Sequence, residues 1–272
     1  MPIADSHVSV KAPGHSPADR FPDQVRLLPG EDLLHNHELI SDDSSGDTTA
    51  EQWGTLTGLR RSWAFWGPWL SGCKGELRLS ISVVGRQPSH ELSNLSFFNP
   101  TAFEMVLVHY LNDLYGHSIW EGLQPETPRW HGPMDWQQHH HLPVFSASFN
   151  IYGRGEDLPG KTEADRLNIG GSQPDQLFVF PITDQHFVKV VFKQHIYSKD
   201  EQRKPLFDTS PIQTLQDAIF NSLTLKLSPE AQASYDKVKA EHRNMQLSKE
   251  FAPLKWPTPA YEPGSRYRIQ PG

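Results

Sequence analysis

Apolar and polar side chains alternate most regularly near residue 190 of this 272-residue chain. In Phe187–Tyr197, apolar residues at every second position are separated by Lys189, Lys193 and His195. A period of two places one side of a strand on a core and the other side in water. A short apolar run, Leu177–Ile182, precedes this segment across a polar connection. The two runs predict an antiparallel hairpin at the centre of a domain.

The same alternation predicts further strands in the first half of the chain. Glu76–Val84 has Leu and Ile or Val at alternate positions, with Arg and Ser between them. Val144–Tyr152 alternates in the same way, and Leu59–Trp66 is a candidate first strand that ends before Gly67 and Pro68. The patterns of Glu76–Val84 and Val144–Tyr152 are typical of strands that are buried on one side.

Three segments have helical signals. Asn99 is a favourable N-cap before Pro100–Tyr115, in which apolar residues recur at helical spacing. Ser-Pro pairs at Ser210 and Ser228 begin two further candidate helices, the last of them more polar. With few helical crossovers between strands, the order favours an α+β fold. We expect an antiparallel sheet of four to six strands with two or three helices packed on one face, including the Pro100–Tyr115 helix on its apolar side.

The composition of the two ends predicts three regions. Residues 1–52 are polar and end in a low-complexity acidic stretch, so we expect a largely irregular N-terminal arm with Leu33–Ile40 as a candidate anchor. Residues 53–250 form a single α+β domain, in which His117–His141 is expected to be a long ordered loop. Residues 251–272 contain several prolines and aromatic residues, which predicts an extended tail.

Charge and cysteine content narrow the functional classes. A formal charge of −7 argues against nucleic-acid binding, which requires basic patches to neutralise phosphates. No apolar run reaches the about 20 residues that span a bilayer, and the first residues do not resemble a secretory signal. Cys73 is the single cysteine, so no intrachain disulfide can form. We therefore expect a cytoplasmic protein without membrane partners.

Histidine is the most abundant candidate for chemistry, with fourteen residues in the chain. His35 and His37 form one pair at positions i and i+2, and His139 and His141 form another. On an extended backbone such a pair shares a face and could chelate a divalent metal. Neither pair belongs to a recognised metal motif such as HExxH. We expect no bound metal or other cofactor, with these four histidines as the alternative metal site.

Motifs for nucleophilic catalysis and nucleotide binding are absent from the chain. It lacks the GxSxG serine elbow, the phosphate-binding loop GxxxxGK[ST] and the dinucleotide motif GxGxxG. Cys73 lies in a glycine-flanked turn beside Lys74, but its surroundings resemble no cysteine-hydrolase signature. No catalytic residue is therefore assigned from the sequence.

Tryptophan is frequent and clustered, with eight residues in the chain. Trp66 and Trp69 lie near the start of the domain, and Trp130 and Trp136 lie in the expected long loop. Tryptophan is favoured at interfaces because it offers a large rigid surface with one polar atom. The alternative is that both clusters simply cover the end of the sheet.

Two functional hypotheses follow. The first is a non-enzymatic protein-binding module of the inhibitor, immunity or adaptor type, which acts by occupying a partner protein through these four tryptophans. The second is a hydrolase or metal-dependent enzyme whose histidines converge only in the fold. Convergence of the histidines would favour the enzyme, whereas an exposed tryptophan patch would favour binding.

Overall fold

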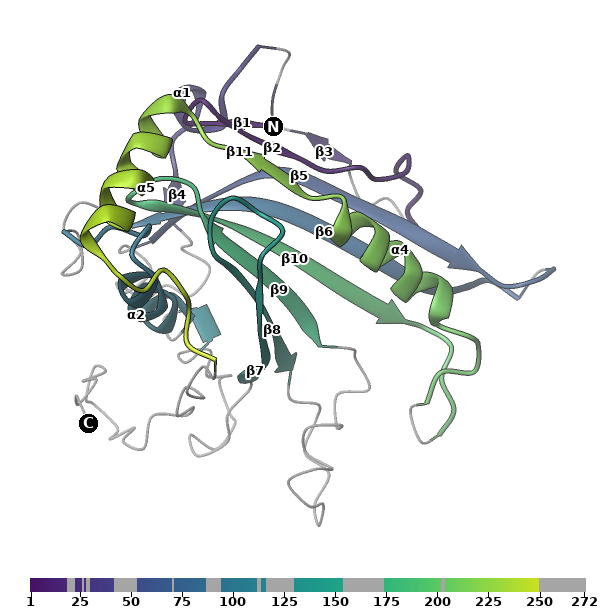
Figure 1. The fold of residues 1–272 in the computed structure, drawn as a ribbon. Helices are drawn as coiled ribbons and strands as arrows, with labels where there is room; N and C mark the ends of the chain where they lie inside the picture. Colours follow the sequence, from purple (N-terminus) through teal and green to yellow (C-terminus); the bar gives the residue numbers. More distant parts are fainter. Residues whose placement is uncertain are drawn as a thin grey trace, which may run out of the picture.

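A computed structural model describes most of the chain, with gaps (Figure 1). The described residues are 1–18, 23–25, 27, 30–41, 53–69, 71–86, 94–111, 114–115, 130–153, 174–201 and 204–249. Six longer strands form one antiparallel sheet in the order β5-β6-β10-β9-β8-β7. Their bounds are β5 Trp53–Trp66, β6 Cys73–Arg86, β7 Trp130–His139, β8 Ser146–Gly153, β9 Asp175–Pro181 and β10 His186–Ile196. The expected α+β class with an antiparallel sheet is confirmed.

The predicted central hairpin is formed by β9 and β10, and β10 also pairs with β6 from His186 opposite Gly85 to Ile196 opposite Gly75. Two short strands, β3 (Gln24–Val25) and β4 (Ile40–Ser41), pair with the outer edge of β5. They cover part of an edge that could otherwise pair with other chains.

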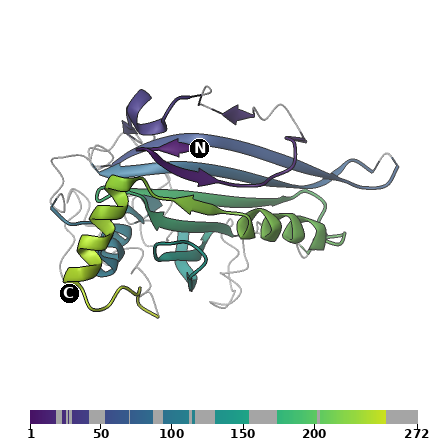
Figure 2. The same cartoon turned by 45° about the horizontal axis from the view of Figure 1, so that its top comes forward.

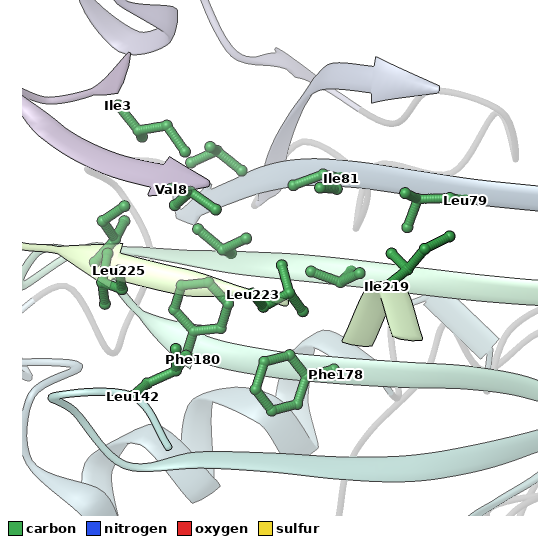
Figure 3. Packing of buried hydrophobic residues seen from close by; sticks show 14 of the residues in the cluster. Ile3, Val8, Leu79, Ile81, Leu142, Phe178, Phe180, Ile219, Leu223 and Leu225 are labelled. Carbon is green, nitrogen blue, oxygen red and sulfur yellow. The ribbon is translucent and has the colours of Figure 1, made fainter. Parts of the chain in front are cut away.

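Both faces of the sheet carry a buried apolar cluster. The first face has the apolar positions that alternation predicts in β6 and β10, and all of them are buried: Leu77, Leu79, Ile81, Val83, Val188, Val190, Phe192 and Ile196. The second face has the apolar positions predicted around β8, which are also buried: Phe145, Ala147, Phe149 and Ile151. Phe178 and Phe180 of β9 belong to the first face, and Leu177 and Val179 to the second. Figure 3 shows part of the packing on the first face.

The helices cover both faces of the sheet, which corrects the expectation that they share one. Helix α2 (Pro100–Leu111) packs against the second face through Phe103, Val106 and Leu107, while its predicted N-cap Asn99 accepts from the Thr101 backbone N–H at 3.0 Å. Ile212 and Ile219 of α4 (Ser210–Asn221) pack on the first face, as do Ala231 and Val238 of α5 (Pro229–Glu241). Because α2 lies on the second face, Lys189 is buried there and its Nζ donates to the Tyr110 hydroxyl, although alternation predicts that Lys189 faces water.

The described part of the expected irregular arm contains regular structure. Strands β1 (Pro2–Ile3) and β2 (Ser6–Ser9) form a three-stranded antiparallel sheet with β11 (Thr224–Lys226). Ile3 and Val8 thereby lie in the core of the first face, as labelled in Figure 3. Residues 42–52 of the arm and the tail at 251–272 lie outside the described residues.

Asp32 joins the N-terminal hairpin to helix α1 (Leu33–Asn36). Its carboxylate accepts from the backbone N–H groups of Ala4 and Asp5 at 2.8 Å each, and from Leu34 at 3.0 Å. Ala4 and Asp5 have φ values of 47° and 60°, so the β1–β2 turn is in the left-handed region. The capping carboxylate thus holds a tight turn and a helix start together.

The prediction of a loop at His117–His141 is wrong for the second half of that segment, which forms edge strand β7. Its pairing with β8 has register shifts on both sides of Met134, and Asp135 has a φ of 56°. These irregularities interrupt the alternation from which a strand is predicted. The first part of the expected loop, residues 117–129, lies outside the described residues. Among the described helices, none is both long enough and apolar enough to cross a membrane.

Candidate functional site

The β5–β6 hairpin extends beyond the other strands at one end of the sheet (Figures 1 and 2). Its turn is closed by the Gly67 N–H, which donates to the Gly72 carbonyl at 3.0 Å, and by the Ser71 hydroxyl, which donates to the Pro68 carbonyl at 2.6 Å. Trp66 is 64% exposed and Trp69 is 96% exposed. The hairpin therefore presents two large apolar side chains to solvent.

Tyr197 lies at the same end, directly after β10. Its backbone N–H donates to the Lys74 carbonyl at 2.9 Å, one residue from Cys73, which pairs with Trp66. Its side chain is 50% exposed. Among the residues that the structure describes, Trp66, Trp69 and Tyr197 are the exposed Trp, Tyr and Phe residues. We refer to these three residues as the hairpin-end surface.

The Tyr197 hydroxyl contacts an ion pair between buried Glu76 and partly exposed Arg78. The Glu76 side chain projects from the second face of β6, because the next residue, Leu77, lies on the first face. Glu76 is fully buried, and its Oε2 accepts from the Tyr197 hydroxyl at 2.9 Å and from Arg78 Nη2 at 2.8 Å. The Ala18 backbone N–H approaches Oε1 at 3.3 Å. The carboxylate therefore has charged and neutral donors from three segments of the chain.

The protonation states follow from these contacts. Burial by itself raises the pKa of Glu76, but the hydrogen bonds it accepts outweigh that effect and the net pKa is lowered. Burial, together with the hydrogen bond to Glu76, raises the pKa of Tyr197 to about 12. Near neutral pH, Tyr197 is thus a neutral donor to an ionised carboxylate. This charge-assisted hydrogen bond holds the exposed ring in one orientation.

The other two predicted tryptophans belong to the opposite edge of the sheet. Trp136 of β7 is partly buried, stacks on Phe149 with ring centroids 5.8 Å apart, and donates from Nε1 to the Ser248 carbonyl at 3.0 Å. Trp130 begins β7, and its side chain lies outside the described residues. Because four strands separate β5 from β7 in the sheet, Trp136 does not share a surface with Trp66 and Trp69.

The predicted histidine pairs contact different groups. His35 lies near Asp5 and Asp32, and these three form the group of candidate metal ligands found in the described part of the chain. Asp32 in that group already accepts four backbone N–H groups, which accounts for its burial as a helix cap. His37 lies 3.8 Å from Glu31. His139 and His141 instead pack around Phe178 and Phe220.

His139 and Ser148 form the contact that most resembles a catalytic pair. His139 Nε2 lies 2.8 Å from the Ser148 hydroxyl. Burial, reinforced by the neighbouring His141 and His140, lowers the pKa of His139 to about 4. A base of that strength is poorly matched to removing a hydroxyl proton near neutral pH, and Ser148 is only 5% exposed. The contact satisfies two polar groups in the packed region between β7 and β8.

Sequence reasoning missed Tyr197 and Glu76, which the alternation pattern treats as the ends of two strands. Their pairing depends on register, since β10 pairs with β6 at His195 opposite Glu76. The sequence did contain a signal for the ion pair: Glu76 and Arg78 have opposite charges at positions i and i+2, and residues at that spacing share a strand face. No protein-family model, curated protein or solved structure matched the chain.

Proposed function

We propose that this protein is a non-enzymatic binding module that acts by occupying a partner protein, and that the hairpin-end surface is the contact. The observation that carries the proposal is that the exposed aromatic residues of the described chain, Trp66, Trp69 and Tyr197, come from one end of the sheet. Large aromatic side chains dominate the affinity of many protein interfaces. An inhibitor, immunity or adaptor role fits a surface of this kind.

The backbone of Trp69 supports a role in contact rather than in folding. Its φ is 27°, in the left-handed region that favours glycine, and its side chain is 96% exposed. A non-glycine residue there costs roughly 1–2 kcal/mol of conformational strain. The indole recovers little of that cost by burial in the isolated chain. Such a cost is understandable if the ring is used by a partner.

Preorganisation supports the same interpretation. Tyr197 is held by a hydrogen bond to Glu76, which is itself paired with Arg78. Trp66 lies within the paired part of β5 and β6. Binding through side chains that are already ordered costs less conformational entropy than binding through mobile ones. The enzyme alternative has weaker support, since His139 and His141 pack with aromatic rings and His35 lies beside a helix cap.

Substitution of the exposed tryptophans tests the proposal. The partner would be identified by crosslinking in the native host, purified, and its affinity measured by biolayer interferometry. We expect Trp66→Ala or Trp69→Ala to weaken binding by about 2 kcal/mol or more, roughly thirtyfold in Kd. Met105→Ala is the matched control, because Met105 is 46% exposed but lies on α2.

Two results would contradict the proposal. One is equal affinity of the wild type and both tryptophan variants, provided that their melting temperatures are unchanged. The other is turnover of a small-molecule substrate by the isolated protein, which would favour the enzyme instead.

A further inference from the structure

A cavity of about 350 Å³ lies between the N-terminal strands and the edge of the large sheet. It is lined by β2 and the residue that follows it, by β5 and β6, and by the segment around β3. The residues that define its character are Val8, Val10, Leu27, Leu59, Arg61 and Ile81. The cavity lies on the first face, because Leu59 of β5 pairs with Ile81 of β6, which is buried there.

Arg61 has the cationic side chain among these lining residues. Met1 also lines the cavity, but its N-terminal ammonium already donates to the Val8 carbonyl at 2.7 Å. Its Nε lies 3.5 Å from Oδ1 of Asp23, which is within ion-pair distance but long for a hydrogen bond. The side chains of Arg61 and Asp23 are 28% and 38% exposed. The guanidinium is thus partly desolvated and only loosely paired. A carboxylate can form two parallel hydrogen bonds with such a group.

We propose that this cavity binds a medium-chain monocarboxylate, with the alkyl chain among the valine and leucine side chains and the carboxylate on Arg61. A volume of about 350 Å³ lies near the lower end of the range for small-molecule sites, which fits a ligand of roughly a dozen non-hydrogen atoms. Decanoate has about that number. Cavities of this size with apolar walls and few polar groups are typical of small-molecule sites.

Asp23 gives the proposal a specific consequence. The ligand carboxylate and the Asp23 carboxylate would compete for the same guanidinium. Removing the charge of Asp23 should therefore increase affinity, whereas removing the charge of Arg61 should reduce it. Arg60 is the matched control, since it is the neighbouring residue on β5, is exposed, and projects from the opposite side of the strand.

Isothermal titration calorimetry with decanoate, below its micellar concentration, tests the proposal. We expect saturable one-to-one binding to the wild type, at least tenfold weaker binding to Arg61→Gln, tighter binding to Asp23→Asn, and no change in Arg60→Gln. Decanol and decyltrimethylammonium should bind more weakly than decanoate, because neither has the anion.

Failure of wild-type protein to bind decanoate would overturn the proposal, as would equal affinities for decanoate and decanol. If Arg61→Gln is unstable, the Asp23→Asn comparison decides, and unchanged or weaker binding by that variant counts against the site. The cavity and the hairpin-end surface share no residue, so this result is independent of the proposed binding function.

Discussion

The two ends of the large sheet are built differently. One end has the β9–β10 turn around Asp184, and the other has the β5–β6 turn at Gly67–Gly72. The Asp184 carboxylate accepts from the hydroxyls of Ser96 and Ser234. The backbone carbonyl of Asp184 accepts from the Phe97 N–H at 2.9 Å. One aspartate thereby connects the hairpin to the segment before α2 and to α5. Helices α2 and α5 lie at this end in Figure 1.

Aromatic packing reinforces the Asp184 end. Phe187 is fully buried, and its ring contacts Phe97, Phe103 and Tyr110 with centroids 5.3 to 6.1 Å apart. At the other end, Trp66 and Trp69 are exposed. The hydrogen bond to Glu76 there holds Tyr197, which is itself half-exposed. Both ends are rich in aromatic residues, but only one uses them for the core. Aromatic content alone therefore does not separate a stabilising cluster from a surface for contact.

The largest expected effect is at the Asp184 end. Phe187→Ala should destabilise the protein by about 3–5 kcal/mol, because it removes buried aromatic contacts and leaves a cavity. Trp66→Ala should change stability by less than about 0.5 kcal/mol, since its side chain is largely exposed. Urea unfolding of both variants measures the difference. Similar losses in the two variants would break the contrast between the ends.

An intermediate effect concerns His186, at the start of β10. Burial, together with the nearby Arg86, lowers the pKa of His186 to about 4. The unfolded chain has the ordinary value of about 6.5, so it takes up the proton first as pH falls. The contribution of His186 to the free energy of unfolding is therefore fully present above about pH 6.5. It is lost as the pH falls towards about 4, which lowers stability by at most about 3 kcal/mol.

The pH dependence of urea unfolding checks this prediction. His186→Gln should show a smaller loss of stability than the wild type between those two pH values. Identical slopes in the wild type and the variant would mean that His186 is not kept neutral by its surroundings.

The smallest expected effect on stability is at the tip of the β5–β6 hairpin. Trp69→Gly relieves the left-handed strain, so the free energy of unfolding should stay the same or rise by up to about 1 kcal/mol. Binding to the partner should fall in the same variant. Thermal unfolding and interferometry measure the two quantities. A stability loss beyond about 1 kcal/mol would show that Trp69 supports the fold.

Much of the fold was predictable because it depends on local patterns. Alternation located β6, β8, β9 and β10, and Asn99, Ser210 and Ser228 marked the starts of three helices within a residue or two, although the N-cap of α4 is Thr209. Edge strand β7 was missed because its bulges and the left-handed Asp135 disturb the period. The candidate site was only partly predictable: Trp66 and Trp69 were found, whereas Tyr197 depends on Glu76, 121 residues away.

Local patterns in the sequence were enough to place four of the longer strands and three helices, together with one apolar side of each of those strands. The tertiary structure decided what covers the second face, and thus why Lys189 is buried against Tyr110 while Lys193 remains exposed. It also decided which tryptophans reach solvent, since Trp63 is buried and Trp66, three residues later, is not. The physical reason is that periodicity records a side chain's direction along its own strand, whereas burial depends on elements that arrive from distant parts of the chain.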